Sequence, residues 1–229
     1  MKIAAWSGPR NLSTALMYSF ANRADFTVID EPFYAPYLAS TGLNHPMSDR
    51  ILATHETDAK RVAIVCANDD KKLHKYMKHM PHHMLDGFPL DWTKACVNIH
   101  LIRHPAHVIA SYAIKRENPT LEDIGYPQQL ALYDRIGGLV VDSSYIRQDP
   151  ESALKNLCAK IGISFDRAML SWSAGPRPFD GIWASHWYHA VHQSTGFLVF
   201  ENDLPVLNGS HIALCKQAMP YYLALLKKI

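Results

Sequence analysis

A short loop near the start of the sequence has the residue types of an anion-binding site. Between the apolar run 3–6 and a helical pattern over 11–22 stand Ser7, Gly8, Pro9, Arg10, Asn11, Leu12, Ser13 and Thr14. Gly8 allows close approach to the backbone, Arg10 and two hydroxyls add donors, and the helix start offers free N–H groups and a positive dipole end. The loop favours anion binding, although a plain capped turn has similar residues.

A second candidate anion site follows another apolar run. Arg103 comes directly after residues 97–102, and Pro105 suits the first turn of a following helix. Ser111 lies about two helical turns beyond Arg103, so its hydroxyl faces the guanidinium if the helix packs along the sheet. The pair predicts a phosphate site, with a helix-capping arginine and a serine packed on the sheet as the alternative.

The segment 78–83 carries groups that suit proton transfer. It contains Lys78, His79, Met80, Pro81, His82 and His83. A histidine near its usual pKa accepts a proton from a hydroxyl at neutral pH, and Glu31, after another apolar run, is a rival base. Surface histidines in a loop and a structural role of Glu31 in a turn are the alternatives. Neighbouring His82 and His83 point in different directions without a carboxylate at ligand spacing, so we predict no metal site.

Short apolar runs alternate with helical patterns and must position these groups. The predicted strands are 3–6, 27–30, 74–77, 97–102 and 139–142, and the predicted helices are 11–22, 105 to about 115, 150–160 and 212–227. This alternation predicts a three-layer α/β/α sandwich with a central, mainly parallel sheet. Such a sheet binds ligands beyond the carboxyl ends of its strands, where the candidate residues lie.

The composition predicts one ordered domain over residues 1–229. Apolar residues make up 48% and charged residues 19%, and 23 basic against 21 acidic residues leave a net charge of +2, which argues against a dedicated nucleic-acid binder. The absence of a long apolar run predicts no membrane span. Scattered cysteines without CxxC pairs favour a reducing, cytoplasmic location. Residues 173–200 are interpreted as a lid or acceptor loop.

The two candidate anion sites together resemble the nucleotide-binding motifs of the sulfotransferase superfamily. The first loop is similar to its 5′-phosphosulfate loop, and Arg103-His104-Pro105 with Ser111 is similar to its 3′-phosphate motif, RxP followed by Ser. The resemblance continues through residues 30–33, 78–83 and 181–183, and it is greatest to a bacterial-type branch of unassigned substrate. It implies a P-loop nucleotide-kinase-like fold and the donor 3′-phosphoadenosine 5′-phosphosulfate (PAPS). The residues it assigns to the donor are Gly8, Pro9, Arg10, Asn11, Leu12, Ser13, Thr14, Arg103, Ser111 and Arg177.

Three segments depart from the superfamily's common patterns. Leu12-Ser13 stands where the first loop usually ends in Gly-Thr or Gly-Ser. The superfamily's Lys-Thr-His-Leu-Pro segment, with His as base and Lys near the leaving oxygen, is one residue longer than 78–81. Alignment on the proline makes His79 the base, whereas alignment on Lys78 keeps the lysine's role. Arg177 with 181–183 resembles a late RKGxxGxW segment that closes over the 3′-phosphate, but it is one residue shorter and has Pro178 at the second basic position.

The leading hypothesis is transfer of a sulfuryl group from PAPS to a hydroxyl or amine of a small-molecule acceptor, leaving adenosine 3′,5′-bisphosphate (PAP). The resemblance and residue types make the catalytic candidates His79, Lys78, His82 and Glu31. We expect no metal and neither a nucleic-acid nor a membrane partner. The sequence identifies neither the acceptor nor the oligomeric state.

Two other functions remain open from the sequence. A small-molecule kinase using ATP and magnesium is suggested by Leu139–Asp142, which resembles a strand ending in a magnesium-binding aspartate. Against it, the loop lacks the GxxxxGK[ST] motif, since Leu12 precedes Ser13 where that motif has Lys. The other alternative is a non-catalytic nucleotide-binding protein of the same fold.

Overall fold

A five-stranded parallel sheet forms the centre of the structure, a computed structural model that describes residues 1–69, 73–114, 118–197 and 203–229. Its strands are β1 (Lys2–Ser7), β2 (Phe26–Asp30), β3 (His74–His79), β4 (Val97–Ile102) and β5 (Leu139–Asp142), in the order β2-β3-β1-β4-β5. Every pair of neighbours is parallel. All five predicted strands are confirmed.

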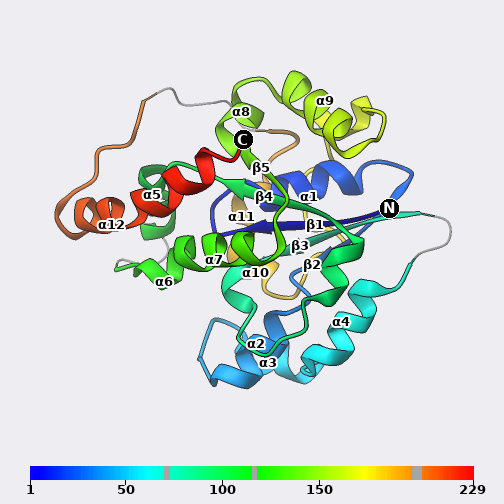
Figure 1. Cartoon of the computed structure of the whole chain (residues 1–229), viewed down its shortest axis with the longest axis horizontal. Helices are drawn as coiled ribbons and strands as arrows, with labels where there is room; N and C mark the ends of the chain where they lie inside the picture. Colours follow the sequence, from blue (N-terminus) through cyan, green and yellow to red (C-terminus); the bar gives the residue numbers. More distant parts are fainter. Residues whose placement is uncertain (70–72, 115–117, 198–202) are drawn as a thin grey trace.

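Helices cover both sides of this sheet (Figure 1). The longer ones are α1 (Ser13–Ala21), α2 (Tyr34–Thr41), α3 (Ser48–Thr54), α4 (Ala59–Ala67), α5 (Pro105–Ala113), α7 (Tyr126–Ile136), α8 (Ser143–Gln148), α9 (Pro150–Ile161) and α12 (Gly209–Leu226). Short helical turns are η1 (Pro81–His83), η2 (Asp91–Ala95), α6 (Leu121–Ile124), η3 (Arg167–Leu170), α10 (Ala184–Trp187) and α11 (His189–His192). The predicted α/β/α sandwich is confirmed. The predicted end of the second helix, near residue 115, lies outside the described residues.

Alternate strand residues enter cores on opposite faces of the sheet. Ile3 and Ala5 pack with α1, α8 and α9, whereas Ala4 and Trp6 pack with α4, η2 and α7. Side chains that follow one another along a strand point to opposite faces, so the position of a residue within its strand decides which helices it meets. The helices α5, α7 and α12 complete the second face around Ile102.

The strand order reverses next to β1. The chain passes from β1 to β2 and β3 on one side, then crosses to β4 and β5 on the other. Parallel sheets leave a crevice at the carboxyl ends of the strands where the order reverses, because the connecting helices diverge to opposite faces. The loops after β1 and β4 therefore meet at one edge of the sheet.

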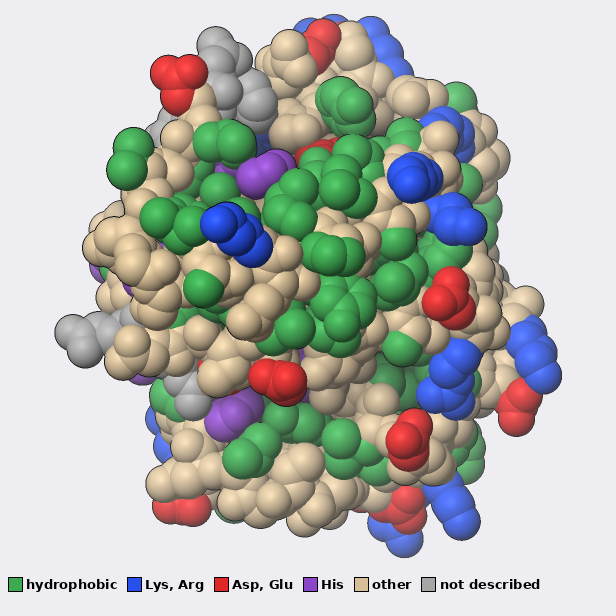
Figure 2. Space-filling view, turned by 60° about the vertical axis from the view of Figure 1, so that its left-hand side comes forward, with side chains coloured by type: hydrophobic (Ala, Val, Ile, Leu, Met, Phe, Trp, Pro, Cys, Tyr) green, Lys and Arg blue, Asp and Glu red, His purple; other side chains and the backbone are tan. Residues whose placement is uncertain are grey.

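The helix α12 is apolar on more than one side. Leu214, Ala218, Tyr222 and Leu225 are buried against α5 and α7, while Ile212 and Leu223 are each 43% exposed. Figure 2 brings the α12 side of the molecule forward and shows hydrophobic side chains gathered among scattered charged ones. Within the described residues, no helix combines the length and the apolar character needed to cross a membrane.

Asp142, at the end of β5, is a structural carboxylate. One of its oxygens accepts a hydrogen bond from the N–H of Ser144 and caps α8, at 2.8 Å, and the other accepts from the hydroxyl of Tyr222, also at 2.8 Å. The side chain is buried. Asp142 therefore ties β5 to both α8 and α12.

We predict that Asp142→Ala lowers the free energy of unfolding by about 2–4 kcal/mol, because it removes a helix cap and a hydrogen bond to a buried charge. Tyr222→Phe is the matched control, since it removes only the second contact and is expected to cost about 1–2 kcal/mol. Urea unfolding of both variants measures the difference. Equal losses would mean that the α8 cap contributes nothing.

Candidate functional site

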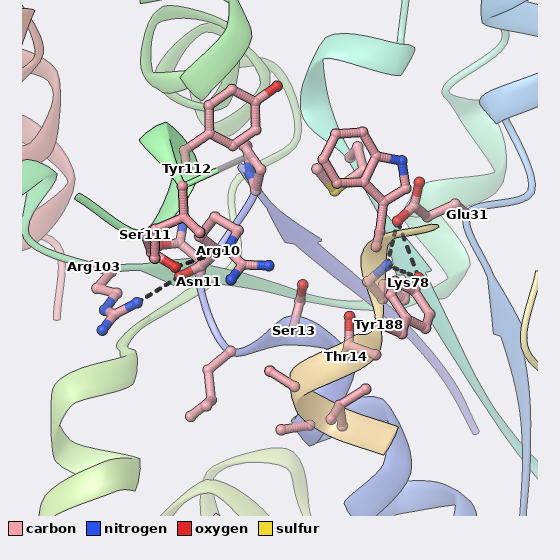
Figure 3. Close-up of a pocket in the computed structure, with 18 of the residues that line it drawn as sticks. Arg10, Asn11, Ser13, Thr14, Glu31, Lys78, Arg103, Ser111, Tyr112 and Tyr188 are labelled. Atoms are coloured by element: carbon pink, nitrogen blue, oxygen red, sulfur yellow. Dashed lines mark hydrogen bonds and ion pairs between the residues drawn. The ribbon is translucent and has the colours of Figure 1, made fainter. Parts of the chain in front are cut away.

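A pocket of about 680 Å³ opens at the carboxyl ends of β1, β3 and β4. It is lined by the loop after β1, by Lys78 of β3, by Arg103 after β4, by α5 and by the segment 186–196. Figure 3 shows the labelled side chains in three groups, with Arg10, Ser111 and Arg103 at one end, Lys78 and Glu31 at the other, and the start of α1 between them. The pocket brings together most of the residues predicted from the sequence.

The first loop forms the middle of the pocket. Pro9, Arg10, Asn11, Leu12, Ser13 and Thr14 all line it. Leu12 is the N-cap of α1 and makes no side-chain hydrogen bond as a cap, and the first turn of a helix has N–H groups without helical partners. Arg10 and Leu12 have φ of 62° and 67°, a left-handed backbone that L residues adopt at a cost and that is concentrated at functional sites. The loop thus presents its backbone and hydroxyl groups to the pocket, and anion binding there stays a prediction.

Gly8 has a different role from the one expected. A Cβ at Gly8 would lie 2.5 Å from the carbonyl oxygen of Ile124, and its N–H donates to Oε1 of Gln129 at 3.2 Å. Gly8 is also outside the pocket lining. The sequence predicted close approach of a ligand, but the group that approaches is the α6–α7 turn. Gly8 is needed for packing.

Arg10, Ser111 and Arg103 form the cationic end of the pocket. The Nε–H of Arg10 donates to the Ser111 hydroxyl at 2.8 Å, and Arg103 donates to the backbone carbonyl of Arg10 at 2.9 Å. Pro105 occupies the first turn of α5, as predicted, and Ser111 lies further along the same helix. The two anion sites predicted separately are thus neighbours, joined by hydrogen bonds.

Lys78 lies at the other end in a buried network. Its ammonium donates to Oδ1 of Asp30 at 3.0 Å, to Oε1 of Glu31 and to the hydroxyl of Tyr188 at 2.7 Å. Only 2% of the Lys78 side chain is exposed. Burial lowers the pKa of Lys78, but the attraction of Asp30 and Glu31 outweighs burial and holds the pKa above its usual value. Lys78 is therefore a fixed positive charge inside the pocket.

Glu31 belongs to this network and also lines the pocket. Burial raises the pKa of Glu31, Lys78 opposes the rise and the neighbouring Asp30 adds to it. Its φ of 42° is in the left-handed region, and its N–H donates to the carbonyl of Lys78. A carboxylate with a raised pKa is a stronger base than an ordinary one, so Glu31 is suited to accept a proton.

His79, predicted as a base, lies outside the pocket lining. It follows Lys78 along β3 and therefore points to the opposite face, where its ring stacks on Trp6 with centroids 4.4 Å apart. Burial lowers the pKa of His79 to about 3, and neither ring nitrogen has a hydrogen-bond partner among the described residues. The choice of His79 was wrong, because Lys78 and His79 cannot face the same side of one strand. The alignment on Lys78 is the one that the geometry supports.

The remaining residues of this segment line the pocket. Met80, His82 and His83 all do so. Burial lowers the pKa of His82 to about 4 and that of His83 well below its usual value, so both rings are neutral at pH 7. His82 stays a candidate, and His83 joins it.

Arg177 does not reach the pocket. Its backbone N–H donates to the carboxylate of Asp180 at 2.8 Å, and the residue is absent from the pocket lining. The N–H of Gly181 donates to Oδ2 of Asp30 at 3.2 Å, and the Trp183 ring packs against the Cα of Gly181. This segment therefore braces Asp30 instead of closing over the cationic end. The structure places Arg177 outside the pocket lining, so its role at the 3′-phosphate stays a prediction.

Part of the predicted lid does cover the pocket. Trp187, Tyr188, Val191 and Ser194 line it, whereas Trp183 is core. The end of the predicted lid, residues 198–200, lies outside the described residues.

Several pocket residues were not predicted. Arg147 of α8 adds a cation, and its position just after β5 was the available signal. Asp30 is outside the pocket lining but precedes Glu31 and shares Lys78 with it. The rings of Tyr112 and Trp187 lie nearly parallel, with an interplanar angle of 4° and centroids 6.4 Å apart. Only folding brings these two rings together.

Asp142 does not line the pocket. Because both of its oxygens are used in structural hydrogen bonds, the strand-end aspartate gives no support to a magnesium site. Across 1–69, 73–114, 118–197 and 203–229, no group of three or more His, Cys, Asp or Glu side chains is arranged to hold a metal ion.

Comparison with known proteins identifies the family of the chain through a family model. The family model described as "Sulfotransferase domain" matches residues 1–229. Two curated proteins of Arabidopsis thaliana, named branched-chain-amino-acid aminotransferase-like proteins 1 and 2, are 36% and 35% identical over 227 and 226 residues, each covering 96% of this chain. The chain spans 40% of the length of these relatives.

Solved structures share the fold at low identity. A sulfotransferase domain from the curacin biosynthetic pathway has a TM-score of 0.54 at 15% identity, covering 96% of this chain and 97% of that one. A sulfotransferase from Alicyclobacillus acidocaldarius has a TM-score of 0.55 at 10% identity, covering 99% and 96%. These likenesses establish the α/β architecture.

We predict that Leu12→Gly is more stable than Leu12→Ala by about 1 kcal/mol, although Gly is normally the less stable of the two. Both variants lose the leucine side chain, so the comparison isolates the cost of a Cβ at a φ of 67°. Thermal unfolding of the pair measures the difference. A more stable alanine variant would contradict the left-handed backbone at this position.

Proposed function

Because the chain belongs to the sulfotransferase family, we propose that it transfers a sulfuryl group from PAPS to a hydroxyl or amine of a small-molecule acceptor. The observation that carries this proposal is the arrangement of one pocket, in which an arginine-rich end and a lysine–glutamate end lie on either side of the first turn of α1. We propose this as the activity of residues 1–229, taken as one domain.

The cationic end suits the 3′-phosphate of the donor. Arg103 and Ser111 offer a guanidinium and a hydroxyl, and Arg10 is hydrogen-bonded to Ser111 at 2.8 Å. Guanidinium groups bind phosphate oxygens through two parallel hydrogen bonds. Arg147 adds positive charge to the same pocket. The residues present therefore fit a bisphosphorylated nucleotide.

The adenine ring has a suitable platform nearby. Tyr112 follows Ser111 on α5, and its ring is nearly parallel to that of Trp187. Nucleobases stack on aromatic faces with little dependence on base identity. We assign these two rings to the adenosine part of the donor.

The 5′-phosphosulfate fits the middle of the pocket, where PAPS supplies an activated sulfuryl group. The N–H groups of the first turn of α1, with Ser13 and Thr14, face this region and stabilise negative charge on the leaving phosphate. Lys78 adds a fixed positive charge. We expect no metal requirement, because a sulfuryl group carries less negative charge than a phosphoryl group.

Glu31 takes the role of general base in this proposal. Its carboxylate lines the pocket beside Lys78, and its pKa is raised chiefly by burial. Lys78 then has two tasks, to hold Glu31 in place and to stabilise the leaving oxygen. His82, neutral at pH 7, is the other titratable candidate from the sequence.

The two alternative functions make different predictions. A kinase requires binding of ATP and magnesium, but Asp142 is used in the fold and the loop lacks the phosphate-binding lysine. A non-catalytic nucleotide-binding protein would bind PAP without transfer. We retain the predictions of a cytoplasmic location and of no nucleic-acid or membrane partner as part of the proposal.

Arg103→Ala is expected to weaken PAP binding by about 10- to 100-fold, because a hydrogen bond to a charged group contributes about 1.5–3 kcal/mol. Binding of adenosine 5′-monophosphate, which lacks the 3′-phosphate, is expected to change little. Isothermal titration calorimetry with both nucleotides measures this, and Arg61→Ala, whose side chain is 72% exposed, is the control. Equal losses of affinity for both nucleotides would contradict the assignment of Arg103 to the 3′-phosphate. If the unaltered protein does not bind PAP at ~1 mM, the proposal that PAPS is the donor is refuted.

Glu31→Gln is expected to reduce turnover by about 10²- to 10⁴-fold while PAP affinity is kept, because the amide cannot accept the acceptor's proton. The base works only when deprotonated, so kcat/KM falls as the pH drops through the raised pKa of Glu31. This acid limb is expected above the ordinary glutamate value of about 4.3. Release of PAP from PAPS with a mixture of alcohols and amines is the assay, and Glu56→Gln, at an exposed position, is the control. Full activity of Glu31→Gln would reject Glu31 as the base.

A further inference from the structure

His83 is held rigidly against the acceptor end of the pocket. Its ring stacks on Tyr34 with centroids 4.5 Å apart and an interplanar angle of 5°, and on Tyr37 with centroids 4.9 Å apart. Only 3% of the side chain is exposed. Despite this burial, Nδ1 of His83 has no hydrogen-bond partner among the described residues. A buried polar atom without a partner usually has a ligand or a water to bind.

The missing partner fits between His83 and Glu31. Oε1 of Glu31 accepts from Lys78 and Tyr188, whereas Oε2 lies 4.0 Å from Nδ1 of His83. That distance is too long for a direct hydrogen bond. Two hydrogen bonds of about 2.8 Å, meeting at roughly 90° on one atom, would span it. One small polar group hydrogen-bonded to both atoms would bridge this distance.

The charge of Glu31 determines which groups donate. Burial is the main cause that lowers the pKa of His83, with Lys78 adding to it, and the imidazole is therefore neutral. One ring nitrogen carries a proton and the other does not. A proton on Nδ1 faces the Glu31 carboxylate, while a lone pair there would be repelled by it. Nδ1 is thus the donor and Oε2 the acceptor.

We propose that His83 binds the nucleophilic group of the acceptor and that this group is the hydroxyl of an uncharged alcohol. The inference rests on the proposed sulfuryl transfer. A hydroxyl donates its proton to Glu31, accepts from Nδ1 with one lone pair and keeps the second for the sulfur atom. A neutral amine has a single lone pair, so it cannot accept from His83 and attack at the same time.

The formal charges at this end oppose an anionic acceptor. Asp30 and Glu31 carry two negative charges when ionised and Lys78 one positive charge, which leaves a net charge of −1 in a buried site. The arginines Arg10, Arg103 and Arg147 line the same pocket, but the proposed function assigns them to the donor. A carboxylate or phosphate next to the reacting hydroxyl would be repelled.

PAPS, the acceptor hydroxyl and Glu31 account for every bond and proton in the sulfuryl transfer. The acceptor oxygen forms a bond to sulfur while the bond from sulfur to the bridging oxygen of PAPS breaks. The electron pair of that bond stays on the phosphate of PAP, next to Lys78. The hydroxyl proton passes to Oε2 of Glu31, and His83 keeps its proton throughout. His83 is therefore an orienting group, in contact with the acceptor.

The first experiment supplies radiolabelled PAPS with matched probes. Each scaffold (aliphatic, benzylic and sugar) is offered as a neutral alcohol, as the amine with nitrogen in place of that oxygen, and as the alcohol with an added carboxylate. We expect label on the neutral alcohols, at least 10-fold more than on the other two members. Label mainly on the amines or the carboxylates, or on no probe by protein that binds PAP, overturns the proposal. Failure to bind PAP refutes the proposed function instead.

The second experiment tests His83 itself on the best alcohol. His83→Leu removes the donor, whereas His83→Asn places an amide N–H at the same number of bonds from Cα as Nδ1. We expect His83→Leu to lower kcat/KM for the alcohol by about 10- to 100-fold with unchanged PAP affinity, and His83→Asn to restore at least a third of the activity. His189→Gln, at an exposed position, is the control. Equal activities of the leucine and asparagine variants, or an unchanged kcat/KM in the leucine variant, overturns the role of His83.

Discussion

The buried ammonium of Lys78 must be balanced by negative charge, and much of the site follows from the groups that do so. An unpaired charge in the interior costs many kcal/mol, and Lys78 has Asp30, Glu31 and the Tyr188 hydroxyl around it. Asp30 is braced by the N–H of Gly181, and Tyr188 by the indole of Trp183. The charge requirement thus couples β2, β3 and the segment 181–188 into one unit.

That coupling also sets the chemistry. Two carboxylates share one lysine, so one of them can keep a raised pKa and act as a base without losing its place in the network. The same residues would be an ordinary surface salt bridge in water, where an ion pair contributes about 0–1 kcal/mol. In the buried site the carboxylate of Glu31 has a defined orientation, because Oε1 is hydrogen-bonded to Lys78 and Oε2 is turned to His83.

The arginine end of the pocket follows a different constraint, which is backbone geometry. Arg10 and Leu12 adopt left-handed φ values without glycine, so packing must hold the loop in place. Gln129 and the carbonyl of Ile124 close around Gly8, and Arg103 binds the carbonyl of Arg10. The family pattern commonly has Gly where this chain has Leu12, and the structure explains why, since only glycine takes this conformation without cost.

The sequence by itself determined the strands, the α/β/α class and the places of Arg10 and Arg103 in the loops after β1 and β4, because each depends on short-range patterns of apolar runs, turn residues and helix starts. The sequence paired Ser111 with Arg103, whereas in the structure its hydroxyl accepts from Arg10. It did not decide between Lys78 and His79, since a shift of one residue along a strand reverses the face of the sheet. Nor did it place Gly8 or Asp142, whose partners Ile124 and Tyr222 are tertiary neighbours. The pairing of Glu31 with His83, and of Tyr112 with Trp187, came only from tertiary structure, because contacts between segments far apart in the chain depend on how the helices pack.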